Sequence, residues 1–287
     1  MNPSVILAWF DANARDLPWR APDTTPWGVL VSEVMLQQTP VHRVHDVWIE
    51  WMDRWPLPSG LAAEAPGTVV RAWGKLGYPR RALRLHTAAE AIASRHDDVV
   101  PADVDTLLAL PGVGAYTARA VAAFGFGARV PVVDTNVRRV VARALHGMAD
   151  AGPPSTTRDL AQVEALLSDA AAARFSAALM ELGAVVCTAR RPRCADCPVA
   201  AQCAWMRAGR PAGSAPARAA QRFAGTDRQV RGLLLDVLRD AADPVPRGRL
   251  DAVWVDVAQR DRCLDSLLVD GLVEQTDDGR FALPGER

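Results

Sequence analysis

The sequence contains almost no lysine, because only Lys75 among its 33 basic residues is lysine. Chemistry that needs a lysine amine therefore has a single side-chain candidate. The chain also lacks an apolar run that approaches the roughly 18 residues needed to span a membrane. Its first apolar run, 5–10, has no basic residue before it and is followed by Asp11, which is not the pattern of a secretory signal peptide. We therefore expect a cytoplasmic protein without a membrane attachment.

Cysteine is also scarce, with five residues in a chain of 287. In a reducing compartment these residues are expected to be metal ligands or free thiols rather than disulfides. Hydrophobic residues make up 49% of the chain and charged residues 23%, so a disordered chain is excluded. The length predicts one large domain or two modest ones.

Charge is unevenly distributed along a chain whose net charge is zero. Residues 1–186 hold 17 basic and 19 acidic side chains, 187–231 hold 9 and 2, and 232–287 hold 7 and 12. A strongly basic segment in a neutral protein indicates local contact with a polyanion. The acidity of the last segment disfavours such contact there.

The first 186 residues predict helices, because apolar residues recur at spacings of three and four while Gly and Pro fall between the segments. No convincing alternating strand pattern interrupts them. The predicted helices are 4–14, 28–38, 40–54, 80–95, 103–109, 115–125, 135–146, 158–171 and 174–186.

Residues 208–227 predict a linker, because they are rich in Ala, Arg, Gly and Pro and have almost no periodicity. Beyond it the pattern predicts three helices and a hairpin, an order that resembles a winged helix, at 228–240, 248–255, 258–270 and around 277–279. The expected domains are a core that includes the loop 187–203, a linker, and a small winged-helix-like C-terminal domain, at 1–207, 208–227 and 228–287.

Four of the five cysteines lie within seventeen residues, spaced C-x6-C-x2-C-x5-C, at Cys187, Cys194, Cys197 and Cys203. Four thiolates at this spacing can surround one metal centre. Zinc sites with four cysteines usually pair two C-x2-C hooks, whereas this loop has one hook flanked by single cysteines. Compact spacings also occur around iron–sulfur clusters, so spacing alone leaves both metals open. The fifth cysteine, Cys263, is expected to be a packed side chain.

The sequence Leu110–Gly114 (LPGVG) separates two predicted helices. Its glycines permit positive φ and expose backbone N–H groups, and the helix that begins at Ala115 offers further free N–H groups nearby. This is the pattern of a helix-hairpin-helix, in which Gly112, Val113 and Gly114 would bind a nucleic-acid phosphate without reading sequence. An ordinary glycine turn between packed helices is the alternative.

Two carboxylates are notable for their positions. Glu33 is the only ionisable residue of the stretch 28–38, so burial should raise its pKa, which suits a general acid. Asp134 follows the apolar run 130–133 and precedes the predicted helix at 135–146, where capping the helix is the simpler role. Two such carboxylates beside a phosphate-binding hairpin suggest cleavage of a glycosidic bond. One would protonate the leaving group and the other would stabilise an oxocarbenium-like sugar.

Four motifs occur in order along the chain: Glu33–Thr39 (EVMLQQT), Leu110–Thr117 (LPGVGAYT), Val133–Val137 (VDTNV) and the cysteine loop. Together they resemble the helix-hairpin-helix DNA glycosylases with a 4Fe-4S loop, and among these the adenine DNA glycosylases of the MutY type. The resemblance covers about residues 4–205. It implies a mainly α fold of two helical subdomains with a 4Fe-4S cluster on the four cysteines, to which the winged-helix-like domain is added.

The resemblance also implies roles for single residues. Glu33 would protonate adenine at N7 and help water to attack, and Asp134 would stabilise the sugar cation, with Asn136 and Tyr116 beside them. The stretch Arg15–Arg20 resembles the family's adenine-pocket motif. The residues expected to bind substrate are Trp19, Arg20, Leu36 and Met180, together with Gln38, Thr39, Leu76 and Tyr78, of which Gln38 and Thr39 would face the opposite guanine.

Two of these aromatic residues have a simpler alternative. Tyr78 would wedge into the base stack and so help to offset the few kcal/mol needed to unstack a base. Trp19 would line the adenine pocket. Without the resemblance, core packing would account for both side chains.

The scarcity of lysine bears on the reaction. The related endonuclease III glycosylases use a lysine nucleophile just after the hairpin glycines, and this chain has Tyr116 at that position. Because a Schiff base needs an amine, we predict hydrolysis by water with no strand-nicking lyase step.

The sequence departs from the family pattern in two places. The Phe-Ser-His motif of the family's 8-oxoguanine-reading C-terminal domain is absent, and residues 232–287 are too few for that fold. Ala177 stands where many members have Glu or Gln, so one contact to adenine is expected to be lost.

These observations predict a base-excision repair enzyme that flips adenine out of A:8-oxoguanine or A:G pairs in double-stranded DNA and hydrolyses its glycosidic bond. We expect a monomer, and a protein partner for the C-terminal domain stays open. One alternative is a monofunctional glycosylase for another mismatch such as T:G, against which the Gln37-Gln38 pair and the stretch Arg15–Arg20 favour adenine. The other alternative is a non-catalytic iron–sulfur DNA sensor.

Overall fold

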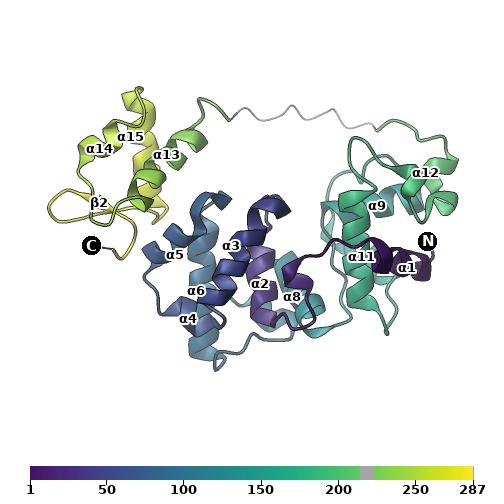
Figure 1. The fold of residues 1–287 in the computed structure, drawn as a ribbon. Coiled ribbons are helices and arrows are strands. Elements are labelled where there is room, and N and C mark those ends of the chain that lie inside the picture. Colours follow the sequence, from purple (N-terminus) through teal and green to yellow (C-terminus); the bar gives the residue numbers. More distant parts are fainter. Residues whose placement is uncertain (214–222, 287) are drawn as a thin grey trace. The chain divides into compact units, whose positions relative to one another are not determined.

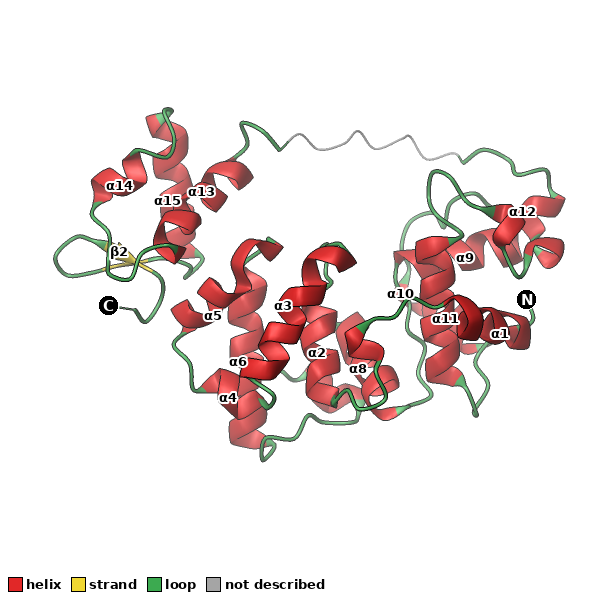
Figure 2. Ribbon diagram, in the orientation of Figure 1, coloured by secondary structure: helices red, strands yellow, loops and turns green. Residues whose placement is uncertain are grey.

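The computed structural model describes residues 1–213 and 223–286, which form a mainly helical protein (Figures 1 and 2). The described residues divide into two compact units, the first made of 1–30, 102–108 and 114–213 and the second of 31–101, 109–113 and 223–286. The predicted fold class is confirmed. The central part of the predicted linker, 214–222, lies outside the described residues. None of the described helices is both long and apolar enough to cross a membrane.

The first unit is built around α11 (Ala172–Val185), which packs against α1 (Pro3–Asn13) and α9 (Thr135–His146). Their apolar faces meet in a buried core that includes Ile6, Val140, Phe175, Leu179 and Leu182. The unit also contains α7 (Val104–Leu108), α8 (Ala115–Phe126), α10 (Thr156–Glu164), α12 (Ala204–Arg207) and 3-10 turns at Pro18–Arg20, Cys194–Asp196 and Ala200–Gln202.

The second unit begins within α2 (Pro26–Met35), because the residues of this helix from Val31 onward belong to it. Its α6 (Arg80–Arg95) packs against α4 (Pro58–Ala62) and α5 (Pro66–Trp73), and a 3-10 turn at Gly74–Leu76 follows α5. Trp51 of α3 (Val41–Arg54) meets two further rings edge to face, at centroid distances of 4.9 Å to Trp55 and 5.6 Å to Trp73. Tryptophan packing therefore joins α3 to α5.

Residues 223–286, here named the C-terminal segment, end the second unit. They form α13 (Asp227–Arg239), α14 (Arg247–Asp251), α15 (Val257–Val269) and the antiparallel strands β1 (Glu274–Gln275) and β2 (Phe281–Ala282). The turn between the strands uses Gly279 at a φ of 80°, which favours glycine. The predicted order of three helices and a hairpin is therefore confirmed.

Several predicted helix limits are wrong. The helix predicted at 158–171 ends at Glu164, because the chain then turns through 3-10-type bonds such as Leu167 N–H to the Glu164 carbonyl. The helix predicted at 28–38 ends at Met35, since Gln38 takes a φ of 57° that no helix accommodates. The short α4 and α5 were not predicted, although each begins at a proline, a residue that fits the first turn of a helix.

Candidate active site and iron–sulfur loop

Glu33 lies in α2 with 8% of its surface exposed, and the neighbouring Val31 and Met35 are fully buried. The predicted burial of this carboxyl is confirmed. Its role as a general acid stays a prediction from the sequence.

Gln38 and Tyr78 share an unusual backbone, with φ angles of 57° and 49°. Non-glycine residues in this left-handed region carry a cost of about 1–3 kcal/mol and persist only where the surroundings hold them. Gln38 is exposed and Tyr78 is 41% exposed, so core packing does not account for Tyr78. Thr39 and Leu76, by contrast, are buried next to them in sequence.

One buried guanidinium holds both turns in place. Arg81 is 6% exposed and donates five hydrogen bonds of 2.7–2.9 Å, to the carbonyl oxygens of Val34, Met35, Gln37 and Gly77 and to Thr39 Oγ1. The Thr39 hydroxyl in turn donates to the Leu76 carbonyl at 3.0 Å. Burial lowers the pKa of Arg81 to about 10, so it stays charged at neutral pH. Arg81 is not among the site residues that the sequence predicts.

The predicted phosphate-binding hairpin connects α7 and α8. The Val113 N–H donates to the Leu110 carbonyl at 3.2 Å and closes the turn. Gly112 has a φ of 74°, and a Cβ there would come within 2.7 Å of the Arg84 Cβ, so only glycine fits. Gly114 takes an extended φ of −96° and caps α8. In the described part of the chain the N–H groups of Gly112 and Gly114 have no acceptor, which leaves them available to an anion.

Asp134 caps α9, as its position in the sequence predicted. Its Oδ1 accepts a hydrogen bond from the Val137 N–H and its Oδ2 accepts one from Asn136 Nδ2, both at 2.7 Å. Burial raises the pKa of Asp134 above its usual value, although these two hydrogen bonds oppose the shift. The carboxylate is therefore held in one orientation by two donors.

Hydrogen bonds lead from Asp134 to the cysteine loop. Asn136 Oδ1 accepts from Arg139 Nη2 at 2.7 Å, and Arg139 Nε donates to the Cys187 carbonyl at 2.6 Å. Arg139 also donates to the Gly183 carbonyl at 2.7 Å. A Cβ on Gly183 would come within 2.7 Å of the Asn136 Cβ, so only glycine lets α11 approach α9 this closely. The cysteine loop and Asp134 are thus joined through two side chains of α9.

Glu181 of α11 is fully buried and binds both arginines of the predicted adenine-pocket motif. Its Oε1 accepts from Arg15 Nε at 2.6 Å and its Oε2 from Arg20 Nη2 at 2.9 Å. Burial by itself would raise the pKa of Glu181, but the hydrogen bonds and charges of these arginines lower it below its usual value. The pairing holds the turn Pro18–Arg20, in which Trp19 is 8% exposed. Glu181 was not identified from the sequence.

Tyr116 and Met180 pack against the same small apolar cluster, formed by Ala120, Ala123 and Val132. The structure therefore brings these two predicted residues together in the first unit, which also holds Asp134, Asn136, Trp19 and Arg20. The other predicted side chains belong to the second unit, and they are Glu33, Leu36, Gln38, Thr39, Leu76 and Tyr78.

None of the four loop cysteines forms a disulfide in the described structure. Among the described residues, no three His, Cys, Asp or Glu side chains converge closely enough to hold one metal ion. Four thiolates can hold a zinc ion or an iron–sulfur cluster.

Arg143 of α9 holds the start of the cysteine loop by hydrogen bonds. Its Nη1 donates to the Thr188 carbonyl at 2.8 Å and to Cys187 Sγ at 3.5 Å. Its guanidinium also lies over the Trp205 ring, 4.7 Å from the centroid. These contacts hold the loop against α9 without involving a metal.

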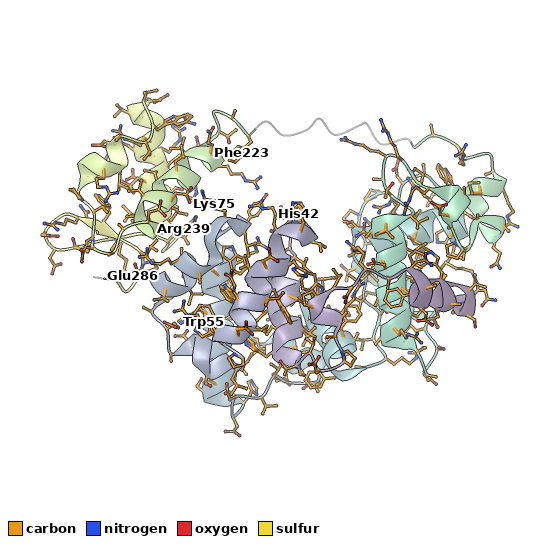
Figure 3. All side chains as sticks on the ribbon, in the orientation of Figure 1. His42, Trp55, Lys75, Phe223, Arg239 and Glu286 are labelled. Carbon is orange, nitrogen blue, oxygen red and sulfur yellow. The ribbon has the colours of Figure 1, made fainter. Side chains whose placement is uncertain are left out.

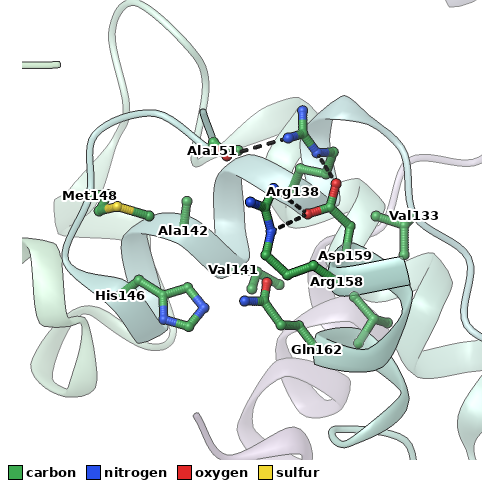
Figure 4. A pocket seen from close by; sticks show the side chains of 11 residues that line it. Val133, Arg138, Val141, Ala142, His146, Met148, Ala151, Arg158, Asp159 and Gln162 are labelled. Atoms are coloured by element: carbon green, nitrogen blue, oxygen red, sulfur yellow. Dashed lines mark hydrogen bonds and ion pairs between the residues drawn. The ribbon is translucent and has the colours of Figure 1, made fainter. Parts of the chain in front are cut away.

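A pocket of about 290 Å³ lies beside α9 and α10 in the first unit (Figure 4). Asp159 accepts from Arg138 at 2.7 Å and from Arg158 at 3.0 Å, and Arg138 also donates to carbonyl oxygens of 151–153. These contacts fasten the loop before α10 to α9. None of the predicted site residues lines this pocket.

Comparisons with known proteins show which family this chain resembles. A family model described as an HhH-GPD superfamily base excision DNA repair protein matches residues 31–165, and one described as the iron–sulfur binding domain of endonuclease III matches 187–203. The adenine DNA glycosylase of Mycolicibacterium smegmatis is 66% identical over 100% of this chain and 97% of its own. The chain belongs to the adenine DNA glycosylase family. Another adenine DNA glycosylase, from Mycobacterium tuberculosis (strain H37Rv), is 62% identical over 98% of this chain and 93% of its own.

Solved structures similar to this glycosylase share its helical core. A thermostable thymine-DNA glycosylase has a TM-score of 0.66 and 25% identity, covering 72% of this chain and 95% of its own. Endonuclease III in a non-covalent complex with DNA has a TM-score of 0.62 and 21% identity, covering 72% and 94%, and indicates the fold alone. This glycosylase is thus a base-excision DNA repair enzyme that carries a 4Fe-4S cluster on the loop 187–203.

Proposed function

We propose that this glycosylase removes adenine from A:8-oxoguanine and A:G pairs in double-stranded DNA by hydrolysis, without cutting the strand. The observation that carries the proposal is the buried carboxyl of Glu33 in a chain related over its whole length to adenine DNA glycosylases. Removal of a purine is aided by protonation of the base, and a carboxyl shielded from water keeps its proton at a higher pH than an exposed one.

In this mechanism Glu33 donates its proton to N7 of the flipped adenine. The glycosidic bond then breaks, its electron pair leaves with the base, and the sugar becomes an oxocarbenium-like cation. The Asp134 carboxylate stabilises that cation, and the hydrogen bonds from Val137 and Asn136 fix its direction. A water molecule adds to the sugar carbon and returns its proton to Glu33, which restores the acid.

The proposed adenine pocket combines Trp19, Arg20, Leu36 and Met180, with Tyr116 packed near Met180. Arg20 is held by the buried Glu181, which supports a fixed pocket wall. Ala177 offers no polar group to the base, so adenine selectivity would depend on the remaining contacts.

On the opposite base, we propose that the exposed Gln38 and Tyr78 make the contacts. Thr39 and Leu76 would support these two residues from the protein interior. The Thr39 hydroxyl accepts a hydrogen bond from Arg81 and donates one to the Leu76 carbonyl. This division of roles refines the expectation that Gln38 and Thr39 both face the guanine. Tyr78 would fill the space that the flipped adenine leaves in the stack.

The DNA backbone would be bound by the hairpin through the N–H groups of Gly112 and Gly114, with Val113 closing the turn. The 4Fe-4S cluster would be held by Cys187, Cys194, Cys197 and Cys203, where it closes the loop structurally. Arg190 and Arg191 are exposed on that loop and carry charge suited to phosphates.

The absence of a lyase step follows from Tyr116 at the position after the hairpin. Lys75 is the only lysine, its side chain is 82% exposed, and its ammonium lies 3.6 Å from an Asp236 oxygen. Incubation of an A:8-oxoguanine duplex should therefore leave the strand intact until alkali is added. Efficient strand cleavage without alkali, or a borohydride-trapped covalent adduct, would contradict this part of the proposal.

Single-turnover excision on duplexes with A opposite 8-oxoguanine, G, C and T, and with T opposite G, tests the substrate. We expect excision of A opposite 8-oxoguanine and G, with little at the other pairs. Equal rates on all pairs would refute mismatch recognition.

The second candidate is a T:G glycosylase, which the similarity to the thermostable thymine-DNA glycosylase favours. Release of thymine from T:G in the same assay would support it. A non-catalytic sensor is distinguished by the Glu33→Gln variant, which should leave a sensor's DNA response intact.

We further propose that the enzyme works as a cytoplasmic monomer, with domains at 1–207 and 228–287 joined by a linker at 208–227. Light scattering on the purified protein, with and without DNA, tests the monomer. A concentration-independent dimer would contradict it.

A further inference from the structure

The C-terminal segment lies against α5, α6 and the turn between them, through contacts that use its acidic residues (Figure 3). Arg71 pairs with Glu286, Arg80 with Asp270 at 3.1 Å, and Lys75 with Asp236 at 3.6 Å. A backbone bond of 2.6 Å from the Gly67 N–H to the Pro284 carbonyl adds to them. The acidity of 232–287 is therefore partly used inside the protein.

A cleft of about 790 Å³ lies between these two parts of the second unit. Eight of the nineteen residues that line it are arginine or lysine, and only two are acidic. Both acidic residues, Asp236 and Asp270, are already paired with cations. Arg43, Arg84 and Arg228 line the cleft without an ion-pair partner in the described part of the chain. The cleft thus carries uncompensated positive charge from both sides.

Aromatic rings accompany this charge. The Arg228 guanidinium of α13 lies 4.6 Å from the Tyr78 ring centroid and 5.9 Å from that of Phe223. Tyr78 and Phe223 are 41% and 56% exposed, and the exposed amide of Gln38 lines the same cleft. Cations interleaved with exposed rings suit a chain of phosphates that also carries flat bases. An acidic peptide would match the charge but would leave the rings unused.

We propose that this cleft binds the sugar–phosphate backbone of DNA, and that Arg228 of the C-terminal segment and Arg43 of α3 each contact a phosphate. The C-terminal segment then contributes to a second DNA-binding surface, separate from the hairpin. Its acidic side chains attach it to the core, and its α13 arginines complete the cleft. The proposal rests on the DNA-acting function proposed above, but it concerns binding and not base removal.

The test uses the full chain and a fluorescein-labelled duplex without any lesion or mismatch, so that excision plays no part. The double variant Arg43→Ala/Arg228→Ala removes one exposed cation from each side of the cleft. Arg249→Ala is the matched control, because Arg249 is also exposed in the C-terminal segment but does not line the cleft. Fluorescence anisotropy over a series of NaCl concentrations gives Kd and its salt dependence.

We expect the double variant to bind on the order of tenfold more weakly and the slope of log Kd against log salt to fall by about 1.8, since each lost phosphate contact removes about 0.9. Arg249→Ala should match the parent, and Arg43→Lys/Arg228→Lys should restore most of the slope. Thermal unfolding of every variant checks that the fold is kept.

Parent-like Kd and slope in the double variant would overturn the proposal. An equal loss in Arg249→Ala would also overturn it, because the effect would then be one of net charge. If only the binding of a labelled polyglutamate peptide falls in the double variant, the cleft belongs to an acidic partner and not to DNA. Failure of adenine excision by the parent protein would leave these binding results unaffected.

Discussion

The five hydrogen bonds of Arg81 predict an unusually large effect for a single arginine. The Arg81→Met variant replaces the stem of the side chain as far as Nε with an unbranched apolar chain and removes the guanidinium with every donor. It leaves four carbonyl oxygens and the Thr39 hydroxyl without their buried partner. We expect both turns, at Gln38 and at Tyr78, to lose their fixed conformation.

The magnitude follows from the partners that are lost. A hydrogen bond from a charged donor contributes about 1.5–3 kcal/mol, but bonds that share one donor group are not additive. Leaving a buried acceptor without its donor costs about 1–3 kcal/mol. Relaxation of the two positive φ angles, each strained by about 1–3 kcal/mol, returns part of this cost. We therefore expect the free energy of unfolding to fall by about 3 kcal/mol, a large share of the stability of a typical domain.

Urea unfolding and single-turnover excision measure the two consequences. The excision rate on A:8-oxoguanine should fall about ten- to hundredfold, because a misplacement of about 1 Å has effects of this size. Arg95→Met in the same helix is the control, since Arg95 is exposed, and it should change stability by less than about 0.5 kcal/mol. An Arg81→Met protein that unfolds within about 1 kcal/mol of the parent and excises adenine normally would refute the reasoning.

Three further predictions concern the buried carboxylates. Glu33→Gln should abolish base release while anisotropy shows DNA affinity within a few-fold of the parent, and residual excision would contradict the acid role. Because the pKa of Asp134 is raised, its carboxylate is lost at a higher pH than an ordinary aspartate, so the acid limb of the single-turnover rate should lie above the usual aspartate range and should vanish with Asp134→Asn. The pKa of Glu181 is lowered, so its stabilisation is present above the usual glutamate range and is lost as pH falls through the folded value. Glu181→Gln should lower the free energy of unfolding by about 3–5 kcal/mol at neutral pH. The variant should also reduce the loss of this free energy as the pH falls, measured by urea titrations at several pH values. An unchanged pH dependence would count against this prediction.

Features whose causes lie close together in the sequence were predictable. Asp134 was expected to cap the helix that begins at Thr135, and its Oδ1 accepts from the N–H three residues on. The wing turn at 277–279 was expected from its Asp-Asp-Gly sequence, and Gly279 takes the positive φ. Such features depend on backbone preferences over three or four residues, which a sequence displays directly.

Arg81 and Glu181 could not be found in this way, because their partners are far away in the sequence. Arg81 binds the Val34 carbonyl 47 residues away, and Glu181 binds Arg15 166 residues away. Glu181 did offer a signal, since it is the only acidic residue of an apolar helix, as Glu33 is in its own. Arg81 offered none, because it stands in a basic stretch whose other arginines are more exposed.

The net charge of a segment is a poor predictor of whether that segment contacts DNA. The excess of acidic residues in 232–287 disfavours contact with DNA, yet two of these residues, Asp270 and Glu286, are paired with arginines of α6 and α5. A charge sum over a segment cannot distinguish side chains that neutralise a neighbour from those that face outward. Only the three-dimensional arrangement separates Asp270, which pairs internally, from Arg228, which lines the cleft.

The close crossing of α9 and α11 at Gly183 sets a limit on how this enzyme can vary. One added methyl group at that position would collide with the backbone and side chain of Asn136. The helices would have to move apart, and the Asn136 amide would carry Asp134 with it. The spacing of the two helices therefore sets where Asp134 lies, and glycine is the residue that preserves this spacing.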